Sequence, residues 1–147
     1  MATHAIIAAP TPGGGWSGAV LDADGYPTAA AAALLSYIPR RFVTPADAAR
    51  HFTVEHPHGY AALADGDPTK GFCYCHDGAE GDTQPYLYDQ DSARGEADWA
   101  YVLADDGLRV IRVRAGWISD PETVPWGSSP EVLGALERRL NSWSPVR

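Results

Sequence analysis

The sequence lacks the features that mark secreted disulfide-rich proteins and membrane proteins. It has only two cysteines, Cys73 and Cys75, and their spacing is too short for a disulfide to link distant parts of a fold. No apolar run approaches the roughly 20 residues of a membrane-spanning helix, and the first residues carry no basic segment of a secretory signal. We therefore expect a soluble cytosolic protein that neither spans a membrane nor depends on disulfides.

Basic side chains are also scarce. The chain has 11 Lys and Arg residues against 19 Asp and Glu residues, which gives a formal net charge of −8. Eleven of the 19 acidic residues lie between Asp65 and Asp106. Because nucleic-acid binding requires a basic surface, we expect no direct binding of nucleic acid. The acidic region is typical of solvated loops, and it would also suit a basic partner or an acidic decoy of a nucleic-acid-binding surface.

What the chain does contain is typical of one folded domain. Hydrophobic residues make up 45% of its 147 residues, and five Trp and seven Tyr are among its aromatic residues. A chain of this length buries about two thirds of the surface that its unfolded form exposes. The 15 Gly and 12 Pro residues punctuate the whole length without a repeat or a linker. We therefore expect a single domain over residues 1–147.

Local signals in the N-terminal third predict two strands and a corner. Strand-forming residues indicate strands over 4–9 and 16–22, joined by the Pro- and Gly-rich loop 10–15. The segment 22–27, D-A-D-G-Y-P, combines acceptor side chains with a glycine, which is typical of a sharp turn. The chain should therefore reverse and leave this corner at Pro27.

Two helices are predicted to follow the corner. Thr28 is a good N-cap for an alanine-rich helix over 29–38, and Pro39 should end that helix because proline disfavours helical geometry in the residue before it. Thr44 is followed by proline and an acidic residue in the first turn, which indicates a second helix over 45–52.

The C-terminal half contains the strongest strand signal. Two β-rich runs over 97–104 and 108–115 flank the turn sequence D-D-G at 105–107, a pattern typical of a β-hairpin. Shorter extended segments are expected at 71–76 and 85–88.

The second strand of this hairpin has a mixed pattern. Ile111 and Val113 should point to one face and Arg112 and Arg114 to the other, which would then face solvent. The apolar residues before them are out of phase with that face, and a bulge near Val110 would reconcile the two patterns.

A final helix is expected to begin at Ser129-Pro130. Val132, Leu133, Leu136 and Leu140 form its apolar stripe. Strands, helices, strands and a helix in this order predict an α+β fold, with an antiparallel sheet and the helices packed mainly on one face.

The best group of metal-ligand residues is Cys73, Cys75 and His76. Thiolate and imidazole are the ligands that zinc prefers, but structural zinc sites usually separate their cysteines by two to four residues. The segment therefore belongs either to a zinc-dependent protein or a small enzyme, or it is a pair of buried cysteines beside a surface histidine. No cofactor is expected apart from this zinc ion.

The aromatic residues indicate a binding surface. Trp16, Tyr26, Trp99 and Tyr101 are among more large aromatics than one small core needs, and aromatics with polar tips are enriched at interfaces. Together with Asp24 at the corner, they are our candidate ligand-binding residues. The alternative use of the aromatics is core packing.

Three segments together resemble a family of small uncharacterised proteins from actinobacteria and their phages. They are W-S-G-A-V-L-D-A-D-G-Y-P at 16–27, C-Y-C-H at 73–76 and W-A-Y-V at 99–102. They correspond to HWDGYP-like, CYCHG-like and WAYV blocks of that family, and Asp22 and Ala23 stand where its members have His and Trp. The resemblance implies an actinobacterial or phage origin and assigns no activity.

The function expected from these observations is a binding or regulatory module that recognises a protein or a small-molecule ligand at the corner. No motif such as G-x-S-x-G or H-E-x-x-H organises the histidines and carboxylates, so no catalytic residue is assigned and an enzyme is the less favoured class. The zinc-dependent protein and the acidic decoy remain the alternatives.

Overall fold

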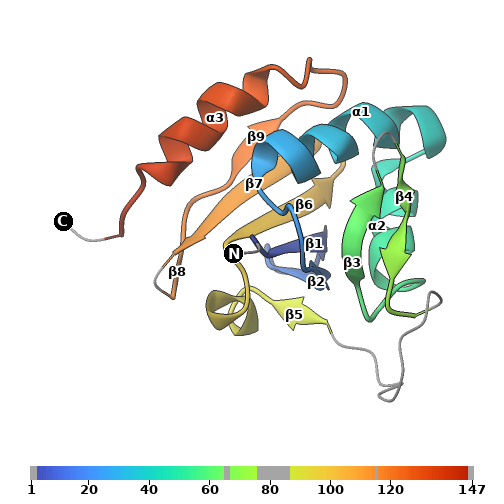
Figure 1. Cartoon of the computed structure of the whole chain (residues 1–147), viewed down its shortest axis with the longest axis horizontal. Helices are drawn as coiled ribbons and strands as arrows, with labels where there is room; N and C mark the ends of the chain where they lie inside the picture. The colour runs from blue at the N-terminus through green and yellow to red at the C-terminus, as the bar shows by residue number, and fades with distance from the viewer. Residues whose placement is uncertain (1–2, 65–66, 76–86, 115, 146–147) are drawn as a thin grey trace.

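The computed structural model describes residues 3–64, 67–75, 87–114 and 116–145, which form an α+β fold around a mixed sheet (Figure 1). The strand order is β4-β3-β2-β1-β6-β7-β8, and β5 and β9 pair with β2 and β7. The predicted α+β class is confirmed. Within these described ranges, no helix has both the length and the apolar character needed to cross a membrane.

An N-terminal hairpin forms the centre of the sheet. β1 (Ala5–Pro10) and β2 (Trp16–Leu21) are antiparallel, and their pairing is continuous along both strands. The strands predicted over 4–9 and 16–22 are confirmed, with boundaries that differ by one residue.

Two parallel pairings correct the prediction of an antiparallel sheet. β1 pairs in parallel with β6 (Trp99–Ala104), and β2 pairs in parallel with β3 (Tyr60–Ala64). β4 (Asp67–Cys73) then adds to β3 in the antiparallel direction. The chain between β2 and β3 runs through two helices, and such a long crossover allows two strands to point in the same direction.

The hairpin predicted in the C-terminal half is confirmed. β6 and β7 (Gly107–Arg114) turn at Asp105 and Asp106 and pair without interruption, so the bulge expected near Val110 is not present. Both faces of the hairpin are buried, because Val110 packs in one core cluster and Ile111 in another. Apolar side chains on either face of the hairpin are therefore buried. No bulge is needed to bring them all to one face.

Arg112 corrects the prediction that one face of this hairpin is open to solvent. It lies on the same side of β7 as Val110, is half-buried, and has its guanidinium carbon 4.8 Å from the centre of the Trp99 ring. Arg114, by contrast, is exposed, and its Nη1 donates a hydrogen bond to the carbonyl oxygen of Asn141 at 2.7 Å.

The first helical segment begins differently from the prediction. A π-type helical turn, η1 (Pro27–Ala31), leads into α1 (Ala32–Arg41), and Tyr26 rather than Thr28 occupies the N-cap position. The backbone N–H and hydroxyl of Thr28 instead both donate to Glu137 Oε1 at 3.0 Å. Thr28 therefore links the start of this helical segment to the C-terminal helix.

Pro39 also departs from its expected role, because it lies inside the last turn of α1 and the helix continues to Arg41. Proline removes one backbone donor, which affects a single hydrogen bond when it sits so close to the helix end. The next turn closes normally, since the N–H of Phe42 reaches the carbonyl oxygen of Ile38 at 3.0 Å.

The other two helices follow the predicted signals more closely. In α2 (Pro45–Thr53), Thr44 is the N-cap as predicted, and its hydroxyl accepts the N–H of Asp47 at 3.2 Å. α3 (Val132–Asn141) begins later than expected and exposes Val132. Its buried residues are Leu133, Leu136 and Leu140.

Short elements complete the fold: β5 (Tyr88–Asp89), the 3₁₀ helix η2 (Ser92–Gly95), β8 (Trp117–Ile118) and β9 (Glu122–Val124). The strand predicted over 71–76 overlaps β4 only as far as Cys73, because Tyr74 and Cys75 form a turn. The extended segment predicted over 85–88 meets β5 at Tyr88. His76 and residues 85–86 lie outside the described residues.

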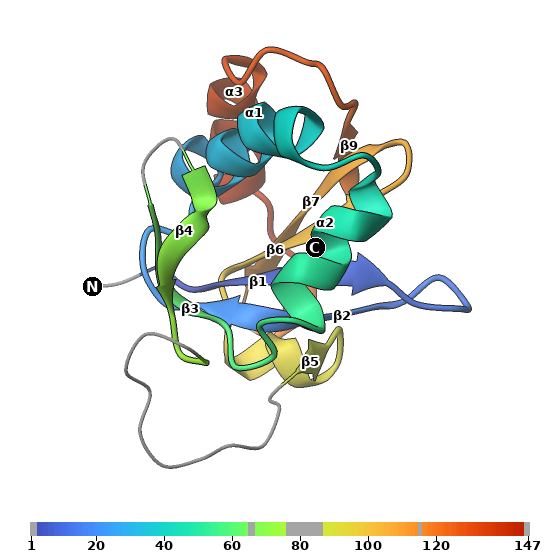
Figure 2. The same ribbon diagram turned by 90° about the vertical axis from the view of Figure 1, so that its right-hand side faces the viewer.

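Two clusters of buried side chains occupy opposite sides of the central strands, because successive side chains of a strand point to opposite faces. The larger cluster combines residues of α1, α2 and α3 with Ile7, Tyr60 and Tyr101. The smaller cluster consists of Ile6, Ala8, Trp16, Ala93, Ala100, Val102 and Ile111. Figure 2 shows α2 lying against β1 and β2, with which it makes contacts.

A substitution at Gly18 would test how tightly the central hairpin is packed. A Cβ at this position would lie 2.1 Å from the carbonyl oxygen of Ile7. We expect Gly18→Ala to lower the free energy of unfolding by about 1 to 3 kcal/mol, as overpacking does in well-packed cores. Urea denaturation measures the change. The control is Gly95→Ala, where a Cβ would meet no atom within 4 Å, and equal losses in both variants would contradict the packing.

Candidate functional site

The corner at residues 22–27 is held by backbone hydrogen bonds on both sides. The N–H of Asp22 donates to the carbonyl oxygen of Tyr60 at 3.0 Å, and the N–H of Gly25 donates to that of Thr3 at 2.9 Å. Only glycine fits at position 25, because a Cβ there would lie 2.8 Å from the Thr3 oxygen. The corner is thus fixed against β3 and against the segment before β1.

A buried tyrosine holds the corner through a hydrogen bond. The hydroxyl of Tyr101, in β6, donates to the carbonyl oxygen of Gly25 at 2.5 Å, and the Tyr101 side chain is fully buried. Burial raises the pKa of Tyr101 well above its ordinary value, and the charge of Glu137 adds to this while that of Arg112 opposes it. The hydroxyl therefore stays protonated and remains a donor to the corner.

A second tyrosine holds the first residue of the corner. The hydroxyl of Tyr74, in the turn after β4, donates to Oδ2 of Asp22. Burial raises the pKa of Tyr74 to about 12, and the hydrogen bond to Asp22 and its negative charge act in the same direction. The neutral phenol thus remains available to hold the Asp22 carboxylate.

Asp24 adopts an unusual backbone conformation at the tip of the corner. Its φ is 54°, and within the described ranges no other non-glycine residue has a positive φ. This conformation costs most residues roughly 1 to 2 kcal/mol, although Asp tolerates it better than others. The π-type turn η1 begins three residues later, and such turns are frequent at functional sites. Both features make the corner a functional-site candidate.

A groove of about 490 Å³ opens beside this corner, between the corner, α1 and β3. Its apolar lining consists of Leu21, Ala23, Ala29, Ala30, Ala32, Ala33 and Leu63. Its polar lining consists of Asp24, Thr28, Ser36 and Arg40. The groove therefore combines a carboxylate and a guanidinium with the methyl groups of several alanines. The elements that border it, α1 and β3, can be followed in Figure 1.

Arg40 is the cation among the described residues of the groove lining, and the sequence alone did not indicate it. Its Nε donates to the carbonyl oxygen of Ser36 at 3.0 Å, and its guanidinium carbon lies 5.8 Å from the centre of the Tyr37 ring. In the described part of the chain, no carboxylate oxygen lies within 4.0 Å of this guanidinium. Arg40 is thus oriented by its own helix.

The predicted ligand-binding residues separate into two groups. Asp24 and Tyr26 lie at the corner and are exposed, Tyr26 to 39%. Trp16, Trp99 and Tyr101 are buried core residues, so they do not form a surface with the other two. Their position agrees with the alternative interpretation, in which most aromatics serve packing.

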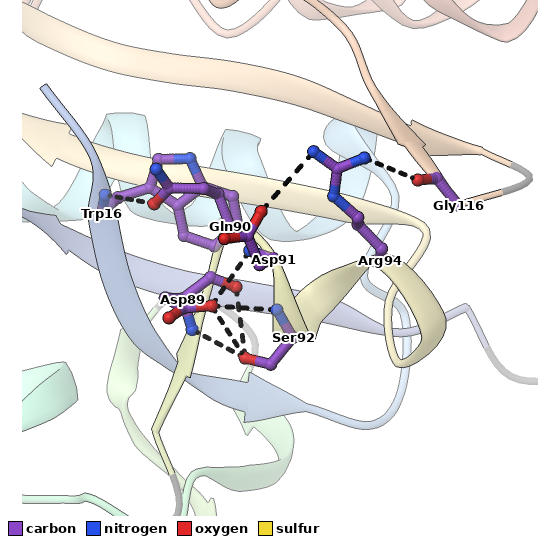
Figure 3. Close-up of polar contacts among 7 residues, drawn as sticks. All are labelled: Trp16, Asp89, Gln90, Asp91, Ser92, Arg94 and Gly116. Atoms are coloured by element: carbon purple, nitrogen blue, oxygen red, sulfur yellow. Dashed lines mark hydrogen bonds and ion pairs between the residues drawn. The ribbon is translucent and has the colours of Figure 1, made fainter.

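Trp16 shows what kind of role the buried aromatics have. Its side chain packs in the smaller core cluster, and its backbone N–H donates to Oε1 of Gln90 at 3.1 Å (Figure 3). The Trp16 side chain thus helps to cover the same face of the sheet as Ala93 of η2.

The predicted zinc ligands are only partly described. Cys73 is buried in the larger core cluster, whereas Cys75 is half-buried and its Sγ accepts the N–H of His58 at 3.3 Å. His76 lies outside the described residues. Among the residues that are described, no three His, Cys, Asp or Glu side chains are grouped so that they could hold a metal ion.

One polar chain was missed by the sequence analysis. Nε2 of His51 lies 3.2 Å from the hydroxyl of Tyr60, and its Nδ1 lies 3.5 Å from Oε1 of Glu55. The i,i+4 spacing of His51 and Glu55 on a helix was the only local signal for it. Tyr60 is 2% exposed, so a substrate in solvent would not reach its hydroxyl, and this carboxylate–imidazole–phenol chain serves the packing of α2 against β3.

Comparison with known proteins adds no functional assignment for these residues. The chain matches no protein-family model, no curated protein and no solved structure. The chemistry of the corner and the groove is therefore inferred from their geometry alone.

Removal of the Tyr101 hydroxyl would test how the corner is held. Tyr101→Phe leaves the Gly25 carbonyl without its buried donor, and we expect the free energy of unfolding to fall by about 1 to 3 kcal/mol. The matched control is Tyr26→Phe, whose exposed hydroxyl makes no hydrogen bond in the described structure. Thermal unfolding measures both. An unchanged Tm for Tyr101→Phe would show that the corner does not depend on this contact.

Proposed function

We propose that the chain is a non-enzymatic binding module whose groove beside the 22–27 corner takes a small ligand. The observation that carries the proposal is the corner itself, held by backbone contacts and by a buried tyrosine so that Asp24 is presented in a left-handed conformation beside the groove. A site that is already formed before binding loses little free energy on ordering, which favours affinity for a small molecule.

The lining of the groove defines the class of ligand. Asp24 offers a carboxylate to a cationic group, and Arg40 offers a guanidinium to an anionic group. The hydroxyl of Ser36 lies on the same lining, and the alanine methyl groups suit a short apolar body. The ligand we infer is therefore a small zwitterion, of the amino-acid kind, with one positive and one negative end.

Binding is favoured over catalysis by the same lining. Among the described residues, the lining of the groove includes no histidine, cysteine or lysine, so no imidazole, thiol or amine is at hand there to activate the Ser36 hydroxyl. A zinc-dependent function at Cys73, Cys75 and His76 is a weaker candidate, because the buried side chain of Cys73 is part of the core.

The other expectations from the sequence stay hypotheses. The actinobacterial or phage origin, the cytosolic location and the acidic decoy are neither needed for the groove nor tested by its geometry. A protein partner at the corner is less favoured than a small molecule, because the polar groups of the site line a concave surface.

The test is a thermal-shift screen with the common free amino acids as the zwitterionic probes. Simple amines and carboxylates, each with one of the two charges, serve as comparison compounds. A ligand at about 100 times its Kd adds about 2.7 kcal/mol of stability, which raises the Tm of a domain of this size by about 5 to 10 °C. We expect at least one zwitterion to reach this shift and the singly charged compounds to fall well short of it.

Variants then locate the site. Asp24→Asn keeps a residue that accepts the left-handed backbone, and both Asp24→Asn and Arg40→Gln should abolish the ligand-dependent shift while leaving the Tm without ligand nearly unchanged. Arg41→Gln is the control, because Arg41 lies next to Arg40 in α1 and contacts the same Tyr37 ring but does not line the groove. The proposal fails if no zwitterion shifts the Tm, or if the shift survives in both groove variants.

A further inference from the structure

A second cleft, separate from the corner groove, lies at the end of the sheet where the segment before β1, η2 and β7 meet. Its volume is about 340 Å³. The charged and titratable residues on its lining are His4, Arg94, Glu96, Asp98, Arg112 and Arg114. Three arginines around so small a space are unusual in a chain whose formal net charge is −8.

All three guanidinium groups are oriented by backbone carbonyl groups. Nη1 of Arg94 donates to Gly116 at 3.0 Å, which joins η2 to the turn after β7 (Figure 3). Nη1 of Arg112 donates to the carbonyl oxygens of Asp98 and Val113 at 2.6 and 2.9 Å. Carbonyl groups hold a guanidinium in place without neutralising its charge.

Arg114 is held by a carbonyl group in the same way. Its Nη1 donates to the carbonyl oxygen of Asn141, at the C-terminal end of α3, at 2.7 Å. The lengths of these contacts are those of good hydrogen bonds, so the cleft is formed without a ligand. Arg94 comes from η2, whereas Arg112 and Arg114 come from β7. The three are brought together only by the tertiary fold.

The carboxylates near the cleft compensate these charges only in part. Arg94 has an exposed ion pair with Asp91, 3.6 Å from Nη2 to Oδ1 (Figure 3). Over the described residues, no carboxylate oxygen lies within 4.0 Å of Arg112 or Arg114. Asp98 uses its Oδ2 to accept the backbone N–H of His4 at 3.2 Å. The cleft thus keeps guanidinium groups without direct carboxylate partners.

Arg112 is the most buried of the three arginines. Its Nε is buried and has no hydrogen-bond partner among the described residues. The cation–π contact with Trp99 leaves this N–H donor unsatisfied. Burial lowers the pKa of Arg112, Asp98 opposes this effect, and the positive charge of Arg114 lowers it further. An anion in the cleft would relieve the repulsion between the two cations.

We propose that this arginine cleft binds the phosphate group of a small molecule, with donors from Arg94, Arg112 and Arg114. Guanidinium groups match the geometry of phosphate oxygens and can each donate more than one hydrogen bond. A phosphate, with up to two negative charges, suits three arginines better than a carboxylate does. The size of the cleft and the acidic remainder of the chain argue against a nucleic-acid strand.

The first experiment follows the side-chain Nε–H signals of arginine by NMR while inorganic phosphate is added to the intact protein at constant ionic strength. The Arg112→Lys spectrum assigns the Arg112 signal. We expect saturable shifts of the Arg112 signal with phosphate, and no such shifts with equal ionic strength of chloride. Acetate tests the carboxylate class, and phenyl phosphate distinguishes a phosphomonoester from free phosphate. Absence of a saturable phosphate shift at Arg112 would overturn the proposal.

The second experiment measures phosphate affinity in two variants of exposed arginines. Each of Arg94→Gln and Arg114→Gln should weaken phosphate binding by about tenfold, because each removes a charge-assisted hydrogen bond. Arg109→Gln is the control, since Arg109 is a half-buried residue of β7 that does not line this cleft. Equal affinity in all three variants would show an ion bound elsewhere. The zwitterion-dependent shift of the corner groove should survive in both arginine variants, so the two proposals succeed or fail separately.

Discussion

The parallel pairing of β1 with β6 is the constraint on which the rest of this structure depends. It brings together strands more than 90 residues apart in the sequence, with Ala5 beside Trp99 and Ala8 beside Val102. The pairing lets the Tyr101 hydroxyl donate to the carbonyl oxygen of Gly25. It also lets the carboxylate of Asp98 accept the backbone N–H of His4 at the end of the sheet. The corner groove and the arginine cleft therefore both depend on the same two strands.

Burial of both faces of these strands explains the unusual chemistry around them. Helices supply residues to the larger cluster, and η2 supplies Ala93 to the smaller one. Arg112 is only half-buried, with its guanidinium carbon 4.8 Å from the centre of the Trp99 ring and its Nε buried, and it also lines the cleft. The same burial keeps the Tyr101 hydroxyl protonated as a donor. Both proposed sites thus contain polar groups that a packed core keeps in fixed positions.

Local features of the fold could be predicted from the sequence, and non-local ones could not. The D-D-G turn and the Thr44 cap each depend on a few neighbouring residues, and both are confirmed. The two parallel pairings leave no local trace, so the prediction of an antiparallel sheet holds for most of the strand pairs but fails at these two. The placement of the helices mainly on one face stays a prediction, although α1, α2 and α3 all contribute to the larger cluster.

The candidate site was predictable to the same extent. The acceptor residues and glycine of the corner indicated Asp24 and Tyr26, because turn chemistry is local. Arg40 was missed, since the groove exists only where α1 meets the corner and β3. Trp99 and Tyr101 were assigned to a surface because aromatic composition does not distinguish a binding surface from a core.

The most direct test of this account is the register between β1 and β6 in solution. Cross-strand nuclear Overhauser effects between backbone protons should place Ala5 beside Trp99 and Ile7 beside Tyr101, with both strands running in the same direction. An antiparallel pattern, with Ala5 opposite Val102, or the absence of contacts between the two strands would contradict the fold and both sites derived from it.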